Sequence, residues 1–235
     1  LSSKCFNSIF LPVLIMFNAA LWKRIQTGEP VISISWHPND KYLASGLSNG
    51  VVSVFDVSSG AIVKSFRRFS GFVFGISWHP HGKYFVVGVH DKVCLWDFET
   101  GESARIGEGF EGRVYAVSWS PDGRYIAYGS ERFNLLSWGG WGNVMAVVWL
   151  ERFVFSYSVS WSPDSRYVAC GSSPGVIRLW DVASNNFVRE FERRNNFGVC
   201  VSWSPNGRFV ADGVGSGSVG LWDSLSGKLV KVLSG

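Results

Sequence analysis

A tetrapeptide of the form Ser-Trp-x-Pro returns five times at an almost constant interval. Its tryptophans are separated by 42, 41, 42 and 42 residues. A second marker, an aromatic residue followed by Asp in four of the five copies, comes 18 or 19 residues after each of them. Two independent markers that keep one period over five copies indicate tandem structural units. The motif tryptophans are Trp36, Trp78, Trp119, Trp161 and Trp203, and the second markers are Phe55, Trp96, Trp138, Trp180 and Trp222.

Each unit contains the same four short runs of residues. The first run alternates and ends at the Ser-Trp motif, as in 31–36, and a turn with Pro and Asp, Asn or Gly follows it. The second run begins with Tyr or Phe, the third ends at the second marker, and the fourth is more polar. Alternation with a period of two, tight turns and no helical periodicity predict four antiparallel strands per unit. The fold class is therefore predicted to be all-β.

This pattern resembles the WD-repeat β-propeller family, in which four-stranded sheets stack radially around an axis. The Trp-Asp pairs and turns such as the Ser-Pro-Asp-Gly at 120–123 carry the resemblance. It implies a β-propeller of five recognisable four-stranded blades, an incomplete or degenerate form of a larger ring. We assign the propeller to residues 28–235 and an apolar N-terminal segment to residues 1–27.

The N-terminal segment allows two interpretations. Residues 9–22 are almost wholly apolar, but the run is short for a membrane helix and Pro12 interrupts it. It is either part of an incomplete preceding blade or a targeting segment. Residues 21–26 align with the fourth strand of a preceding unit, and the last unit already has its own fourth strand at 229–233. An arc left open in this way would expose apolar blade faces, through which the chain could associate with itself.

Several positions depart from what the resemblance implies. Family members have a buried hydrogen-bond network between a His before the first strand and an Asp in the turn between the second and third strands. Because other residues stand at the matching His positions, we expect this network to be absent and aromatic packing to replace it, with 12 Trp in the chain. We expect the marker Asp residues to cap turns, and the four His (His37, His79, His81 and His90) to supply turn polarity. The residues at the matching His positions are Thr27, Phe69, Phe110, Arg152 and Arg194.

Two sets of residues are candidates for binding a protein partner. One residue per unit, six positions before the motif tryptophan, is expected at the channel mouth on the loop face. Aromatic and Arg side chains there are typical interface anchors, although the rings could instead wedge between blades. The fourth run of unit three is entirely apolar, which favours either a docking edge or internal repacking. The first set is Phe72, Arg113, Phe155 and Phe197, and the second is Val147 and Trp149.

A weaker hypothesis concerns phosphate. The sequence Phe66-Arg67-Arg68 is similar to the Phe-Arg-Arg-Gly motif of phosphoinositide-binding propellers, although Phe69 replaces the Gly. Adjacent arginines can bind phosphate bidentately. Arg193 and Arg194 repeat the basic pair at the same register of a later unit. A phosphoinositide- or membrane-associated propeller is therefore the alternative function. The net charge of +4 is mild, whereas nucleic-acid-binding proteins normally have a clustered stripe of basic residues, so no nucleic-acid partner is expected.

Catalysis is a remote alternative. Residues 46–50 and 171–175 match the Gly-x-Ser-x-Gly pattern of hydrolases, but the predicted element after each is a strand, whereas a nucleophile elbow leads into a helix. The four Cys share no Cys-x-x-Cys spacing, so neither a metal nor a cofactor is expected, and a reducing compartment fits best. The sequence therefore predicts a non-catalytic scaffold for an unidentified protein partner, located in the cytoplasm or, alternatively, in the nucleus.

Overall fold

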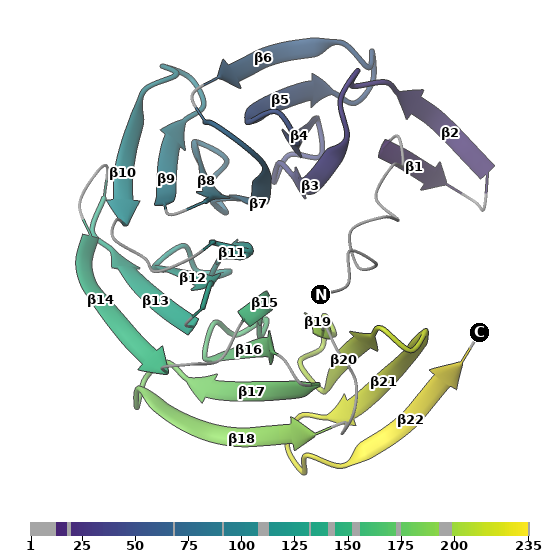
Figure 1. Cartoon of the computed structure of the whole chain (residues 1–235), viewed down its shortest axis with the longest axis vertical. Coiled ribbons are helices and arrows are strands. Elements are labelled where there is room, and N and C mark those ends of the chain that lie inside the picture. Colours follow the sequence, from purple (N-terminus) through teal and green to yellow (C-terminus); the bar gives the residue numbers. More distant parts are fainter. Residues whose placement is uncertain are drawn as a thin grey trace.

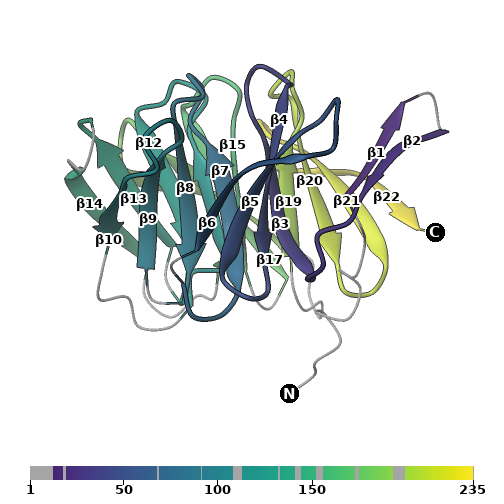
Figure 2. The ribbon, with the colours of Figure 1, turned by 90° about the horizontal axis from the view of Figure 1, so that it is seen from above.

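The computed structural model describes residues 13–17, 20–67, 69–90, 92–107, 113–131, 133–140, 144–151, 156–172, 175–192 and 199–234. Within these residues every regular element is a strand, as the all-β prediction requires. Five four-stranded antiparallel sheets, or blades, surround a central axis, and a sixth sheet has two strands. In each blade the first strand lies nearest the axis and the fourth lies on the outer rim (Figure 1). The strands run roughly along the axis (Figure 2). The β-propeller prediction is therefore confirmed.

The strands of each blade follow one another in chain order as a meander. Blade 1 is β3 (Val31–Trp36), β4 (Tyr42–Leu47), β5 (Val51–Asp56) and β6 (Ile62–Arg67); blade 2 is β7 (Val73–Trp78), β8 (Tyr84–Val89), β9 (Lys92–Asp97) and β10 (Ser103–Gly107); blade 3 is β11 (Ala116–Trp119), β12 (Tyr125–Gly129), β13 (Phe133–Trp138) and β14 (Val144–Glu151); blade 4 is β15 (Ser156–Trp161), β16 (Tyr167–Ser172), β17 (Val176–Asp181) and β18 (Asn186–Glu192); blade 5 is β19 (Val199–Trp203), β20 (Phe209–Val214), β21 (Ser218–Asp223) and β22 (Leu229–Ser234).

The recurring Ser-Trp pair joins neighbouring blades. The backbone N–H of Trp78 in blade 2 donates a hydrogen bond to the Ser35 hydroxyl of blade 1, with a nitrogen-to-oxygen distance of 3.1 Å. The same bond, also 3.1 Å long, joins Trp119 to Ser77 and Trp203 to Ser160. A backbone N–H between two sheets would otherwise lack a partner at a cost in free energy. The motif Ser therefore satisfies the Trp backbone of the next unit at three junctions, and at the junction of blades 3 and 4 the Trp161 indole N–H donates to the Ser118 carbonyl at 3.1 Å.

The core lies between adjacent blades, where aromatic rings interlock. Phe66 of β6 packs on Phe85 and Trp96 of blade 2, with ring centroids 5.1 and 4.9 Å apart. The repeat positions of seven tryptophans predict that they face the core, and six of the seven are buried, whereas Trp203 is only half-buried. The six buried tryptophans are Trp78, Trp96, Trp119, Trp161, Trp180 and Trp222.

The marker Asp residues cap the turns between third and fourth strands, as predicted. The Asp56 carboxylate accepts hydrogen bonds from the Ser58 hydroxyl at 2.6 Å and from the Ser59 backbone N–H at 2.8 Å. These bonds favour the ionised form and lower the pKa of Asp56 to about 2. Asp97, Asp181 and Asp223 accept backbone N–H bonds in the same way.

Two of the four His supply turn polarity, as predicted, and also pack between blades. The Nδ1 of His79 accepts the His81 backbone N–H at 3.1 Å, and the Nδ1 of His37 lies 2.6 Å from the Asn39 Oδ1. The His37 ring packs edge-on against Trp78 of the next blade, with centroids 4.6 Å apart, and its Nε2 lies 3.0 Å from the Gly82 carbonyl oxygen. His79 makes the equivalent contacts with Trp119, at 4.7 Å, and with the Gly123 carbonyl, at 3.3 Å. Burial lowers the pKa of His79. In blades 1 and 2 the residue after the motif tryptophan therefore hydrogen-bonds within its turn and packs against the next blade.

Blade 5 contains a buried polar cluster of another kind than the His–Asp network of the family. Asp212 of β20 is 2% exposed, and its Oδ2 accepts a 2.7 Å hydrogen bond from the Trp222 indole N–H. Its Oδ1 accepts the Gly220 backbone N–H at 2.9 Å. Asp212 lies within the second strand, whereas the Asp of the family network lies in the turn after that strand.

The two-stranded sheet consists of β1 (Val13–Phe17) and β2 (Ala20–Ile25), paired antiparallel. It lies beside blade 1, between that blade and blade 5 in Figure 1. Both end blades expose apolar side chains, among them Ile34 and Trp36 on β3 and Val230 and Val232 on β22. The described part of the chain contains no helix that is long and apolar enough to cross a bilayer. A targeting role for residues 9–22 and self-association through the end blades both stay predictions.

Candidate functional site

A row of aromatic side chains runs across the inner strands of blades 2, 3 and 4. Phe74 of β7, Tyr115 just before β11 and Tyr157 of β15 occupy the second position of each inner run. The ring centroids are 5.9 Å apart for Phe74 and Tyr115, and 5.2 Å apart for Tyr115 and Tyr157. The rings therefore link three blades at the strands nearest the axis (Figure 1).

The loop residues predicted to bind a partner extend this row. Phe72 is 45% exposed and meets Phe74 edge-on, with centroids 5.5 Å apart. The exposed Arg113 guanidinium lies 6.0 Å from the centroid of the same Phe74 ring. Phe74 thus brings together two residues that are 41 positions apart in the sequence. We call Phe72, Phe74, Arg113, Tyr115 and Tyr157 the channel row.

Sequence reasoning found only part of the channel row. Phe155 and Phe197, predicted at equivalent positions, lie outside the described residues. Phe74, Tyr115 and Tyr157 were missed, although a signal was present: the second residue of the first run is aromatic in three consecutive units. A row of ring faces and edges beside a guanidinium can hold apolar, aromatic and anionic side chains of a protein.

The apolar fourth run of unit three is a strand, as predicted. It forms β14 on the outer edge of blade 3, with Val147 opposite Leu136 and Trp149 opposite Asn134. The side chains of Val147 and Trp149 lie outside the described part of the structure. The proposed docking edge therefore stays a prediction.

Only one of the four arginines proposed to bind phosphate can be placed. Arg67 is exposed and borders an open depression of about 560 Å³ with Asn49 and Ser70. Phe66, beside it, is buried in the core between blades 1 and 2. Arg68, Arg193 and Arg194 lie outside the described residues, and the phosphate hypothesis stays a prediction.

The hydrolase-like motif at 46–50 lies in a β-hairpin. It spans the end of β4, a two-residue turn and Gly50 before β5. The Ser48 hydroxyl donates to the Glu29 carboxylate at 3.4 Å. A nucleophile elbow requires a turn from strand to helix, so this hairpin does not provide one. Among the described residues, no three His, Cys, Asp or Glu side chains gather into a group that could hold a metal ion.

Comparisons with known proteins agree with the blade geometry. The model of the WD domain, G-beta repeat, matches residues 60–97, 101–138, 153–181 and 185–223, more than half of the chain. A model of the anaphase-promoting complex subunit 4 WD40 domain matches residues 17–73. No curated protein matches the chain. Among solved structures, the β-propeller domain of Myceliophteria thermophila Cps50 (Swd1) is similar with a TM-score of 0.78 and 15% identity, over 92% of this chain and 74% of that one.

Proposed function

The chain belongs to the WD-repeat family, and we propose that it is a non-catalytic scaffold that binds a protein partner at the channel row. WD-repeat propellers generally bind proteins on a rigid frame of blades. In this chain the frame presents aromatic rings and an arginine near its axis. Aromatic and Arg side chains are common anchors of protein interfaces. Aromatic rings bury a large area with few rotatable bonds.

The observation that carries the proposal is the arrangement of Phe72. Its side chain is 45% exposed, yet the Phe74 ring supports it from one side. A ring that is held in place before binding loses little conformational entropy when a partner covers it. Arg113 lies beside the same ring with its guanidinium exposed, so it can pair with a carboxylate of the partner.

The experiment compares the full-length wild-type protein with the double variant Phe72→Ala/Arg113→Ala. Tagged proteins capture binding proteins from native extract, and quantitative mass spectrometry measures the yield. We expect the yield of the specific partner to fall by about tenfold or more, which corresponds to a loss of about 1.4 kcal/mol. Because both side chains are exposed, we expect the Tm to change by only about 2 °C.

The matched control is Phe187→Ala on the rim strand β18. Phe187 has the same exposed fraction as Phe72, 45%, but belongs to the strand at the opposite edge of blade 4 from the inner strand β15. Its loss should leave capture unchanged. An equal fall in capture for Phe187→Ala, or unchanged capture for the double variant, would refute binding at the channel row. A large fall in Tm for the double variant would show that these side chains are core.

We also place this scaffold in the cytoplasm, with the nucleus as the alternative. Cys94 and Cys170 are buried and form no disulfide, and reduced thiols are stable in a reducing compartment. Fluorescence microscopy of the tagged full-length protein tests the location. Signal that coincides with the endoplasmic reticulum or the cell exterior would contradict it.

A further inference from the structure

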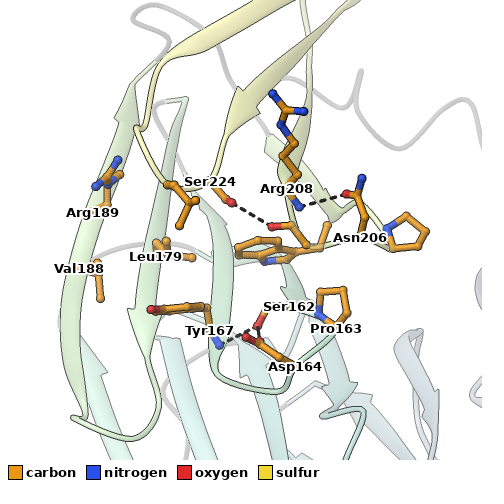
Figure 3. A pocket seen from close by; sticks show the side chains of 14 residues that line it. Ser162, Pro163, Asp164, Tyr167, Leu179, Val188, Arg189, Asn206, Arg208 and Ser224 are labelled. Atoms are coloured by element: carbon orange, nitrogen blue, oxygen red, sulfur yellow. Dashed lines mark hydrogen bonds between the residues drawn. The ribbon is translucent and has the colours of Figure 1, made fainter.

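A groove of about 470 Å³ lies between blades 4 and 5, at the turns that join first to second and third to fourth strands (Figure 3). Tyr167, Leu179 and Val188 form the wall on blade 4, and Trp203 and Leu225 lie on blade 5. The volume is within the range of about 300 to 1,000 Å³ that is typical of ligand sites. Leu225 is 81% exposed, so the groove opens to solvent along an apolar lip.

The equivalent space between blades 1 and 2 is filled by two rings. His37 packs on Trp78 at 4.6 Å between centroids, and Phe98 packs on Trp78 at 5.1 Å and on Tyr42 at 5.4 Å. Lys64 then closes the outer end, because its Nζ donates to the backbone carbonyls of Phe98 and Glu99. We call this filled space the first seam, and the groove between blades 4 and 5 the fourth seam.

The fourth seam is hollow because both rings are absent. By the repeat register, Ser162 stands where His37 does, after the motif tryptophan, and Ser224 stands where Phe98 does, after the marker Asp. Both hydroxyls form hydrogen bonds with neighbouring groups of the chain. Ser162 donates to the Asp164 carboxylate at 2.5 Å, and Ser224 donates to the Gly207 carbonyl at 2.9 Å. The walls formed by Tyr167 and Trp203 therefore remain, with the space between them unfilled.

The other two seams keep a larger side chain in at least one of the two places. In the second seam, between blades 2 and 3, Trp138 packs on His79 at 4.9 Å and on Trp119 at 5.2 Å, and so occupies the position of the missing Phe. In the third seam, between blades 3 and 4, Ser120 replaces the His and Val182 replaces the Phe, and Val182 packs in the same cluster as Tyr125, which stacks on Trp161 at 6.1 Å. The fourth seam differs because both positions have Ser.

Positive charge borders the fourth seam. Arg189 and Arg208 line it from blades 4 and 5, and neither guanidinium forms a hydrogen bond or an ion pair with a residue that the structure describes. Asp164 is already engaged by Ser162 and by the Arg166 backbone N–H at 3.0 Å. Burial opposes its ionisation, but these bonds outweigh burial and lower the pKa of Asp164. Both arginines can therefore pair with a carboxylate of a ligand, and the Arg208 guanidinium also lies 5.0 Å from the centroid of the Phe209 ring.

We propose that the fourth seam binds a partner peptide whose aromatic side chain enters the groove while flanking carboxylates pair with Arg189 and Arg208. The aromatic ring would replace the ring that Ser224 lacks and pack on Trp203. The guanidinium groups would bind carboxylates bidentately. The inference rests on the proposed scaffold function but uses a different surface from the channel row, so the protein presents two separate sites.

The test uses the full chain and a synthetic fluorescein-labelled peptide in which one Phe is flanked on each side by Asp and Glu. Fluorescence anisotropy measures its Kd. Two control peptides replace the Phe by Gly, or the acidic residues by Lys. We expect each control peptide to bind at least about tenfold more weakly than the probe. Equal binding of either control, or no measurable binding of the probe, would overturn the proposal.

Two variants locate the binding. Ser162→His/Ser224→Phe fills the groove with the rings of the first seam, and Arg189→Glu/Arg208→Glu reverses its charge. Each should weaken probe binding by about tenfold or more, with the circular dichroism spectrum unchanged. Arg113→Glu in the channel row should leave it unchanged. If both groove variants bind the probe like wild type, or if phenylacetate alone binds as tightly as the peptide, the assignment is wrong.

The two sites can fail independently. Loss of partner capture in Phe72→Ala/Arg113→Ala with normal probe affinity supports both sites. Loss of capture combined with no probe binding overturns the fourth-seam site and leaves the scaffold function in place. Probe binding that depends on the groove, with capture unaffected by the channel variant, overturns the channel row as the partner site.

Discussion

The first and fourth seams have the same strands and turns and differ in what fills them. In the first seam the rings of His37 and Phe98 meet Trp78, and Lys64 closes the outer end. In the fourth seam Ser162 and Ser224 turn their hydroxyls into local hydrogen bonds and leave a groove of about 470 Å³. The inter-blade bond from a Trp N–H to a Ser hydroxyl is 3.1 Å long in both.

This difference separates two tasks of the repeat. The Ser-Trp pair joins neighbouring blades and the marker Asp caps a turn, so the pair recurs in all five units and the Asp in four, with Gly139 in its place in the third. The residue after each of them only fills the seam, so it can change without moving the strands. A seam with two small residues loses the stabilisation that close packing provides. It gains an accessible groove that can bind a ligand.

The largest expected effect comes from emptying the first seam. His37→Ser/Phe98→Ser gives it the residues of the fourth seam and removes two rings that pack on Trp78. We expect the free energy of unfolding to fall by about 4 kcal/mol, as for deletion of a large aromatic side chain from a core. Urea denaturation measures the change.

His90→Ser is the control for the first seam, because His90 is exposed at the turn after β8. It should change the free energy of unfolding by less than about 0.5 kcal/mol. If the double variant were as stable as this control, the rings would not be what holds blades 1 and 2 together.

A smaller loss of stability is expected when the buried Asp212 of blade 5, which forms one side of the fourth seam, is replaced. Asp212→Val introduces the residue that blade 2 has at this position, Val87, and leaves the buried Trp222 indole N–H without its acceptor. We expect a loss of about 2 kcal/mol in the free energy of unfolding.

Asp212→Asn keeps an acceptor oxygen at the same place and should lose less than Asp212→Val. Thermal unfolding of the two variants side by side measures the difference. Equal losses would show that the Trp222 hydrogen bond contributes little and that the volume of the side chain matters instead.

The smallest effect is a pH dependence of the second seam that the fourth seam cannot have. Burial lowers the pKa of His79 below its ordinary value of 6.5. The unfolded chain therefore takes up this proton first as the pH falls, so stability is complete above about pH 6.5 and declines below it. Wild type should lose Tm between pH 7.5 and 5.5, and His79→Ser should lose less over the same interval. Parallel pH profiles would contradict this assignment.

The sequence predicted the blades well because strands within one unit are local. Alternation and turn residues specify the four strands, and the period specifies their repetition. The contacts between blades were harder to predict, since they join residues about one period apart, such as Ser35 and Trp78. A periodic position shows that a residue recurs but not everything that it contacts, which is why the sequence did not predict the packing of His37 and His79 against the next blade.

The binding surfaces were predicted in part for the same reason. Phe72 and Arg113 were found from their equivalent loop positions, and their link through Phe74 appeared only in three dimensions. The sequence did not predict the groove at the fourth seam, because the groove results from small side chains where other units have rings. It becomes visible only when Ser162 and Ser224 are compared with His37 and Phe98 at the same register.

The central claim is that the groove at the fourth seam is the space that two rings fill in the first seam. The Tm of Ser162→His/Ser224→Phe tests it most directly. Since the rings fill existing space and pack on Tyr167 and Trp203, the account predicts a Tm equal to or above that of wild type. A Tm lower by about 5 °C or more would mean overpacking of a seam that has no such room, and would contradict the account.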